Sequence, residues 1–255
     1  MTAPDPSPRN RLAAQLLEGL RTHQRFAPET ALTPPDRDAA YRIQQDLIVH
    51  LGSPVAAWKV GTAPTAGEVL GSPIPACCVQ QSPARVALAA HDICGVELEV
   101  AFRFRQGFPL RDTPYTDAEV FDALALMAPA IEIVTSRYQG WPDLPDFLKL
   151  ADLQNHGALI LGPALPYAAD FPFLTPRVHL TVGGTDRAKS PAGNPAGDPR
   201  WLLPPFVRQC AARGLPIEAH HWVTTGSYSG IYFVASPGAV IGHLADLPEV
   251  RLDLT

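Results

Sequence analysis

The chain has 255 residues, of which 46% are hydrophobic and 18% are charged, and its formal net charge is −5. This composition is typical of a globular protein and excludes extended disorder. The length suffices for one large domain or for a main domain with a small appendage. Because the net charge is negative and lysine and arginine form no cluster, we expect no nucleic-acid partner.

The first eight residues have neither the basic region nor the apolar region of a secretory signal. The sequence contains no apolar run of about 18–20 residues, the length that a membrane-spanning helix needs. Cys77, Cys78, Cys94 and Cys210 include no C-x-x-C pair, and we interpret them as free thiols buried in the fold. We therefore expect a cytoplasmic protein without a membrane partner.

Residues 7–52 are predicted to be helical. Ser7 and Pro8 are typical of a helix start, and leucines follow at helical spacing. A second set of apolar residues has the same spacing, and Gly52 is placed to end that helix. These two helices predict a helical N-terminal layer over residues 1–54.

From residue 55 onward, short β-rich runs predominate. Two helices interrupt them: one opens with a capping box at Thr116 and Glu119 and continues to Pro129, and the other covers residues 205–213. Because strands outnumber helices and do not alternate with them, we expect an α+β fold. A mixed β-roll or distorted barrel over residues 55–255 would carry the catalytic site. The predicted strands are 55–60, 96–104, 131–134, 158–161, 178–182, 222–225, 231–234, 239–241 and 250–254.

A long connection rich in glycine and proline covers residues 183–199. Loops of this length are uncommon unless they are functional or mobile. We interpret it as an excursion between two strands, with a lid over a site as the alternative.

Three glutamates lie inside stretches that otherwise resemble buried strands. Side chains alternate along a strand, so Glu97 and Glu99 project from one face together. That pair fits a solvated sheet face as well as a site, but Glu132 is the only polar residue between positions 129 and 134. Buried carboxylates need a partner or a metal, and three of them without histidine or cysteine indicate a hard cation, Mg²⁺ or Mn²⁺.

Other candidate residues carry weaker signals. Lys59 lies in an apolar strand, where it either extends to solvent or lies beside carboxylates and a bound anion. The turn at residues 224–230 is rich in glycine and hydroxyls and can present donors to a carboxylate, although tight hairpin turns share this composition. None of the eight histidines has metal-ligand spacing, and we expect them to be satisfied in the fold or solvent-facing.

Taken in order, these segments resemble the 2-keto-4-pentenoate hydratase and 4-oxalocrotonate decarboxylase branch of the fumarylacetoacetate hydrolase superfamily. The Glu-x-Glu pair and the Pro-Ala-Ile-Glu stretch that ends at Glu132 are the most specific part of the resemblance, which covers residues 38–254. The matching segments are 58–61, 96–102, 129–137, 157–162 and 225–227.

The resemblance implies the mixed β-roll of the superfamily and an assembly into homo-oligomers. It implies that Glu97, Glu99 and Glu132 ligate Mg²⁺ or Mn²⁺ and that Lys59 is the active-site lysine. It also places the turn formed by Thr225, Gly226 and Ser227 against a small 2-oxo or 2-hydroxydienoic acid, with Asn155 near a small polar position of the site.

The chain departs from this pattern in two places. Hydratases of this type usually carry an acidic residue after the lysine motif, whereas residues 62–67 and 71–77 contain no aspartate. The usual Ala-Asp-Asn segment has Leu153 in place of the asparagine. These departures affect the residues that would move protons.

We expect a metal-dependent hydratase that adds water to a 2-hydroxydienoate. Decarboxylation of a 2-oxo diacid needs the same chelate and the same stabilisation of an enolate, so it is the alternative within enzymes. Hydrolytic cleavage of a carbon–carbon bond would need a general base, for which His156 is the candidate. A non-catalytic homologue that retains the cation is the alternative from another class.

Overall fold

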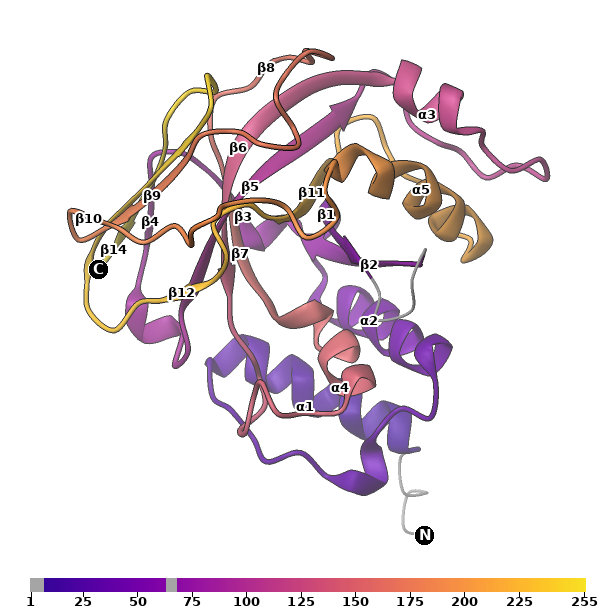
Figure 1. Ribbon diagram of the computed structural model, residues 1–255. Coiled ribbons are helices and arrows are strands. Elements are labelled where there is room, and N and C mark those ends of the chain that lie inside the picture. The colour runs from indigo at the N-terminus through magenta and orange to yellow at the C-terminus, as the bar shows by residue number, and fades with distance from the viewer. Residues whose placement is uncertain (1–6, 63–67) are drawn as a thin grey trace, which may run out of the picture.

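The computed structural model describes residues 7–62 and 68–255 of the chain. Residues 1–6 and 63–67 lie outside these ranges. The second gap contains most of the stretch 62–67, in which no aspartate is present. Two β-sheets pack against each other, and α1 (Pro8–Thr22), α2 (Arg37–Leu51) and α4 (Asp146–Ala151) lie together at one end of the molecule (Figure 1). The predicted α+β class, a mixed β-roll with few helices, is confirmed.

The larger sheet is mixed. The order across the sheet is β2 (Val69–Pro75), β1 (Val55–Thr62), β11 (Trp222–Ser227), β5 (Gly95–Phe104), β6 (Leu124–Val134), β7 (His156–Leu161) and β3 (Val79–Gln81). Its strands run antiparallel except for the pairs β1–β11 and β3–β7, which are parallel. Two short strands extend it, since β12 (Tyr232–Phe233) pairs with β5 and β8 (Leu165–Pro166) pairs with β6.

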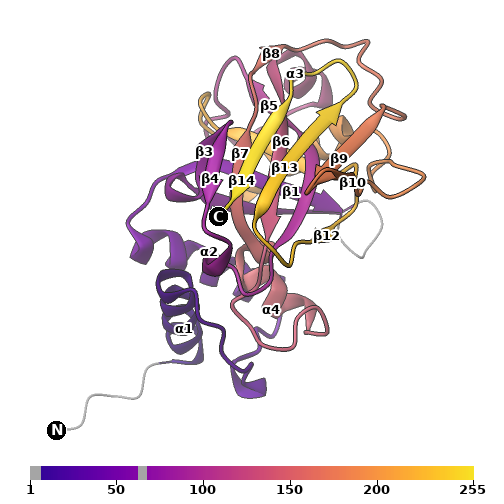
Figure 2. The ribbon, with the colours of Figure 1, turned by 90° about the vertical axis from the view of Figure 1, so that its left-hand side faces the viewer.

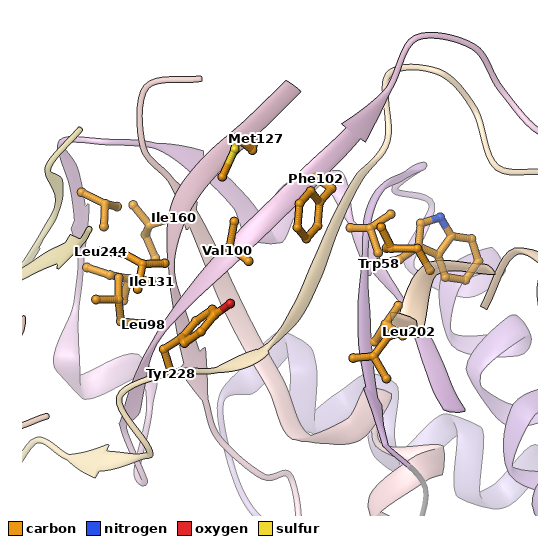
Figure 3. Close-up of a cluster of buried hydrophobic side chains, with 14 of the residues drawn as sticks. Trp58, Leu98, Val100, Phe102, Met127, Ile131, Ile160, Leu202, Tyr228 and Leu244 are labelled. Carbon is orange, nitrogen blue, oxygen red and sulfur yellow. The ribbon is translucent and has the colours of Figure 1, made fainter. Parts of the chain in front are cut away.

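The smaller sheet covers one face of the larger one, with β13 and β14 in front of β5, β6 and β7 in Figure 2. Between the sheets lies the main core, where Leu98, Ile131 and Ile160 gather beside Leu244 (Figure 3). Because Leu98 faces this core, its neighbours Glu97 and Glu99 project from the opposite face. The order of the smaller sheet is β10 (Thr185–Asp186), β9 (Val178–Val182), β13 (Gly238–Leu244), β14 (Val250–Leu254) and β4 (Ala84–Val86).

The predicted N-terminal helices are confirmed. The Ser7 side chain caps α1, Asp36 caps α2, and Gly52 adopts the left-handed conformation that ends α2. Leucines of α1, α2 and α4 share a second core, so the helical layer contains a later segment of the chain as well. The remaining helices are α3 (Asp117–Asp122), α5 (Leu203–Ala212) and the 3-10 turns η1 (Thr30–Leu32), η2 (Ala76–Cys78), η3 (Leu88–Ala90), η4 (Leu153–Asn155) and η5 (Pro199–Leu202).

The prediction of a helix continuing to Pro129 was wrong. The capping box at Thr116 and Glu119 is present, but α3 ends at Asp122 and β6 begins at Leu124. Burial outweighs helical spacing here, because β6 is buried from Met127 to Val134 and apolar except at Glu132. Pro129 lies where the pairing with β7 ends: its carbonyl accepts from the Gly162 N–H, and its missing N–H falls at the end of the ladder.

Within the described ranges, no helix has the length and apolar character needed to cross a lipid bilayer.

Candidate active site

The three glutamates converge on one face of the larger sheet. Glu97 on β5 lies directly opposite Glu132 on β6, and Glu99 lies two residues further along β5. One carboxylate oxygen from each residue lies within 4.8 Å of the others, and Glu99 and Glu132 are 1% and 0% exposed. Like charges at this spacing are unfavourable unless protons or a cation neutralise them. The geometry of the cluster therefore suits a shared cation.

Glu132 uses one oxygen and leaves the other free. Its Oε1 accepts from Lys59 Nζ and from His156 Nδ1, each at 2.9 Å. Burial raises the pKa of Glu132, but Lys59 and His156 outweigh it and lower that pKa to about 2. Its Oε2 is buried without a hydrogen-bond partner in the described part of the chain. An ionised oxygen left in this state is costly, so it is a natural ligand for a cation.

Glu99 is held by the end of β11, where the pairing with β5 shifts register between Thr224 and Ser227, so the predicted turn begins as an irregular stretch of strand. The Thr224 hydroxyl and the Gly226 backbone N–H donate to Glu99 Oε2, the latter at 3.0 Å. Gly226 has a φ of +88°, a conformation that side chains other than glycine rarely adopt, so the turn depends on this residue. Burial and the charges of Glu132 and Glu97 raise the pKa of Glu99 well above its ordinary value. Glu99 is therefore harder to ionise than a free glutamate, and added positive charge favours its ionised form.

The turn orients its hydroxyls differently from the expectation. Thr225 is fully buried and donates its hydroxyl to the carbonyl of Val100, so Thr224 supplies the hydroxyl at the glutamates. Ser227 lies opposite Glu99 on the neighbouring strand, 3.4 Å from the Ser229 hydroxyl. Strand alternation explains the difference, because adjacent threonines on β11 project to opposite faces.

Lys59 reaches the cluster from β1, where it pairs with Thr224 of β11. Its side chain is 16% exposed and ends on Glu132, so it lies beside carboxylates and does not extend into solvent. Burial lowers the pKa of Lys59, but Glu132, Glu97 and Glu99 outweigh it and raise that pKa above its ordinary value. Lys59 is therefore charged, and once all three carboxylates are ionised the cluster carries two negative charges in excess of this ammonium.

His156, which the sequence offered only as a candidate general base, lies at the site as a partner of Glu132. It opens β7, is 1% exposed and donates from Nδ1 to Glu132, while its Nε2 is buried without a partner among the described residues. Burial lowers the pKa of His156 despite the nearby carboxylate, so the ring is neutral with its proton on Nδ1. No spacing in the sequence indicates this contact, which depends on the pairing of β6 with β7.

Asn155 belongs to an unusual turn. Leu153, Gln154 and Asn155 all have positive φ, between 51° and 60°, which costs about 1 kcal/mol or more per residue. The Asn155 amide donates to Asp152 and Ser136 and accepts from the Trp141 indole. Such strain concentrates at functional sites. A cavity of about 280 Å³ is lined by Lys59, Thr62, Leu70, Asp146, Lys149, Leu150, Gln154 and Asn155.

The long connection predicted between strands packs over the turn at Gly226. We call residues 187–198 the cover segment. Its Asn194 is 8% exposed and donates to the carbonyls of Thr225 and Gly226, each at 2.9 Å. Backbone bonds from Lys189 to Ser229 and from Gly193 to Tyr228 fix the segment along the turn. The segment is thus part of the frame that holds Glu99, which composition alone did not reveal.

Comparisons with known proteins find relatives over nearly the whole chain. No protein-family model matches the sequence. The chain is 28% identical over 255 residues to a 2-keto-4-pentenoate hydratase of Paraburkholderia phymatum, covering 94% of this chain and 95% of that protein. It is 29% identical over 259 residues to a 2-keto-4-pentenoate hydratase of Burkholderia vietnamiensis, covering 96% of each chain.

Among solved structures, the fold matches 4-oxalocrotonate decarboxylase from Pseudomonas putida G7, complexed with magnesium and adipate. The TM-score is 0.85, the identity is 16%, and the match covers 100% of both chains. At this identity the match supports the fold alone.

Proposed function

Because the chain belongs to the 2-keto-4-pentenoate hydratase and 4-oxalocrotonate decarboxylase branch of the fumarylacetoacetate hydrolase superfamily, we propose that it is a divalent-metal-dependent hydratase. Its substrate is a 2-hydroxydienoate, and its product is a 4-hydroxy-2-oxo acid. The chain is an enzyme, as its relatives are. The observation that carries the proposal is the buried cluster of three glutamates with one lysine bound to it.

The residues present fit a divalent cation. Glu97, Glu99 and Glu132 supply hard oxygen ligands, and the unpartnered Oε2 of Glu132 has no other cation to satisfy it in the described ranges. The charges also fit, because two positive charges balance the two negative charges that remain once Lys59 is counted. We propose Mg²⁺ or Mn²⁺, which suit such ligands. When bound, the ion supplies Lewis acidity and a template for the acid and its 2-oxygen.

The side chains around the glutamates have separate roles. Lys59 holds its proton on Nζ and attracts the anionic substrate while keeping Glu132 ionised. Asn155 lines the same cavity as Lys59 and orients the substrate. The backbone of Gly226 and the hydroxyl of Ser227, beside Glu99, contact the substrate as well in this proposal. A cavity of about 280 Å³ suits a small acid and limits the water around it.

Decarboxylation of a 2-oxo diacid is the second candidate. It starts from the same bound 2-oxo acid, and the chain shares the fold of a 4-oxalocrotonate decarboxylase. The difference lies at the far end of the substrate, where water adds in one reaction and a carboxylate leaves in the other. Hydrolytic carbon–carbon cleavage fits less well, because His156 is 1% exposed and donates from Nδ1 to Glu132.

The proposal is tested by incubating the protein with Mg²⁺ and a panel of 2-hydroxydienoates and 2-oxo diacids, with products identified by mass. Gain of one water by a 2-hydroxydienoate supports the hydratase. Loss of CO₂ from a diacid without hydration contradicts it and supports the decarboxylase. Inactivity toward the whole panel, with Mg²⁺ bound, also overturns the hydratase proposal.

Two further features belong to the same proposal. Assembly into a homo-oligomer and a cytoplasmic location are implied by the resemblance and by the sequence. Light scattering of the purified protein measures the first, and fractionation of cells measures the second.

A further inference from the structure

Two adjacent cysteines lie apart from the glutamate cluster, in the turn η2 between β2 and β3. The sequence interpretation of four buried thiols is correct for Cys94 and Cys210 but wrong for Cys77, which is exposed, and Cys78 is half-buried. The backbone N–H of Cys77 donates to the Ser53 hydroxyl at 3.1 Å, so the turn is anchored to the end of the helical layer. This hydrogen bond holds the backbone of the turn that carries the two thiols.

The sulfurs of Cys77 and Cys78 are 3.9 Å apart. A disulfide would require them to close to about 2.0 Å, and adjacent trans residues hold their Cα atoms about 3.8 Å apart, below the 4.4–6.8 Å of ordinary disulfides. Direct oxidation of the pair to a disulfide is therefore strained. A single atom that bonds both sulfurs does not need this closure.

The observed spacing suits such a bridging atom. Two thiolates at about 2.3 Å from a pyramidal three-coordinate centre lie about 3.4 Å apart by geometry, so the sulfurs need to close by only about 0.5 Å, far less than a disulfide demands. Hydrogen bonds from Cys78 and Ser53 lower the pKa of Cys77 to about 6, whereas the bond to Cys77 and burial raise the pKa of Cys78. Cys77 is therefore the thiol that loses its proton first, and the thiolate is the nucleophile.

We propose that Cys77 and Cys78 form a dithiol site that binds thiophilic centres able to bridge two sulfurs, with trivalent organoarsenicals as the ligand class. The thiolate of Cys77 attacks arsenic, and Cys78 then forms the second sulfur–arsenic bond. One arsenoxide and two thiols give one dithioarsenite and one water, with no change of oxidation state. This site is separate from the metal-dependent reaction proposed above.

The dithiol lies at the edge of the larger sheet, next to β3. Cys78 lines a small cavity of about 70 Å³ together with Arg137 and Gly157. The strand that begins directly after it, β3, pairs with β7, the strand that opens with His156. A ligand on the dithiol therefore occupies the edge of the sheet beyond β7, while the glutamates lie on β5 and β6.

The test is titration of the full-length protein with phenylarsine oxide, read by intact mass under non-denaturing conditions. The wild type should take up one equivalent, which a small dithiol removes and excess glutathione does not. In Cys77→Ser and in Cys78→Ser, retention should fall by about 100-fold or more, because the second bond is no longer intramolecular. Cys94→Ser removes a buried thiol and serves as the matched control with unchanged uptake.

Equal retention by the wild type and Cys77→Ser would overturn the proposal, as would uptake lost only in Cys94→Ser. Conversion of the pair to a disulfide under mild oxidation, read as the loss of two hydrogens, would contradict the geometric argument. Circular dichroism melting of each variant establishes that it is folded. Cys77 is exposed, so its substitution tests the site even where replacement of Cys78 disturbs packing.

Discussion

Two groups of buried charges lie close together in this protein, and they differ in how completely they are satisfied. In the first, Arg137 donates from its backbone and its guanidinium to Asp152, and also to the carbonyls of Asp152 and His156. Ser136 and Asn155 donate to the same carboxylate. In this group the two formal charges cancel, and both carboxylate oxygens are occupied.

The second group is the glutamate cluster, and it is incomplete. Three carboxylates face one ammonium, and Glu132 Oε2 has no partner within the described residues. Both groups are buried, but only the glutamate cluster has a carboxylate oxygen left for a ligand. We therefore assign a structural role to the Arg137–Asp152 pair and a functional role to the glutamates. The Arg137–Asp152 pair holds the strained turn that carries Asn155, so the complete group supports the incomplete one.

The largest expected effect is at Glu132. Glu132→Gln removes the ionised oxygen that the cluster leaves free, so we expect divalent-metal binding and turnover to be lost while the fold is retained. Isothermal titration with Mg²⁺ and Mn²⁺ measures the affinity, and circular dichroism measures the fold. Wild-type metal affinity in this variant would contradict the assignment of Glu132 as a ligand.

Breaking the complete group should instead destabilise the fold. Arg137→Met leaves the Asp152 carboxylate buried without its partner, and we expect a loss of about 3–5 kcal/mol in the free energy of unfolding. Denaturant unfolding measures this loss. Arg25→Met is the matched control, because the Arg25–Asp92 pair is largely exposed at the aspartate and should contribute less than about 1 kcal/mol. Equal losses in the two variants would remove the distinction between the groups.

Lys59 belongs to the incomplete group, and its removal should affect chemistry more than metal binding. For Lys59→Met we expect turnover to fall by about 100-fold, the lower end of the loss when one positioned hydrogen-bond donor is removed, with Mg²⁺ affinity retained. Steady-state kinetics and titration of the same preparation separate the two effects. Unchanged kinetics would mean that Lys59 only balances the charge of Glu132.

A cation should complete the cluster and thereby stabilise the protein. At 100 times the dissociation constant, Mg²⁺ should add about 2.7 kcal/mol to the free energy of unfolding. For a chain of this size, that corresponds to a rise of about 5–10 °C in the melting temperature. Melting with Mg²⁺ and with EDTA measures the shift, which Glu132→Gln should abolish. An equal shift in that variant would place the ion elsewhere.

The sequence predicted the fold class, both N-terminal helices and the position of the glutamates in strands, because these depend on local spacing. It did not predict that β6 begins at Leu124, since burial between two sheets overrides helical spacing. It also gave no signal for His156 on Glu132 or for Asn194 on the turn. Both contacts join residues far apart in the chain, and no single-sequence pattern encodes such pairings.

The smallest expected effect concerns the cover segment, which connects to the cluster through backbone alone. Asn194 donates to the carbonyls of Thr225 and Gly226, and the N–H of Gly226 in turn donates to Glu99. Asn194→Ala should loosen this turn and weaken Mg²⁺ affinity by about tenfold, the lower end of what residues behind a metal ligand contribute. Isothermal titration of the variant measures the change.

The matched control is Asn10→Ala, since Asn10 is an exposed asparagine on α1 and its replacement should leave Mg²⁺ affinity unchanged. A purely structural role for Asn194 predicts a lower melting temperature with wild-type Mg²⁺ affinity. A positioning role predicts weaker affinity in protein that remains folded at the temperature of the titration. Because positive charge favours the ionised form of Glu99, the affinity for Mg²⁺ reports on how well β11 holds this carboxylate.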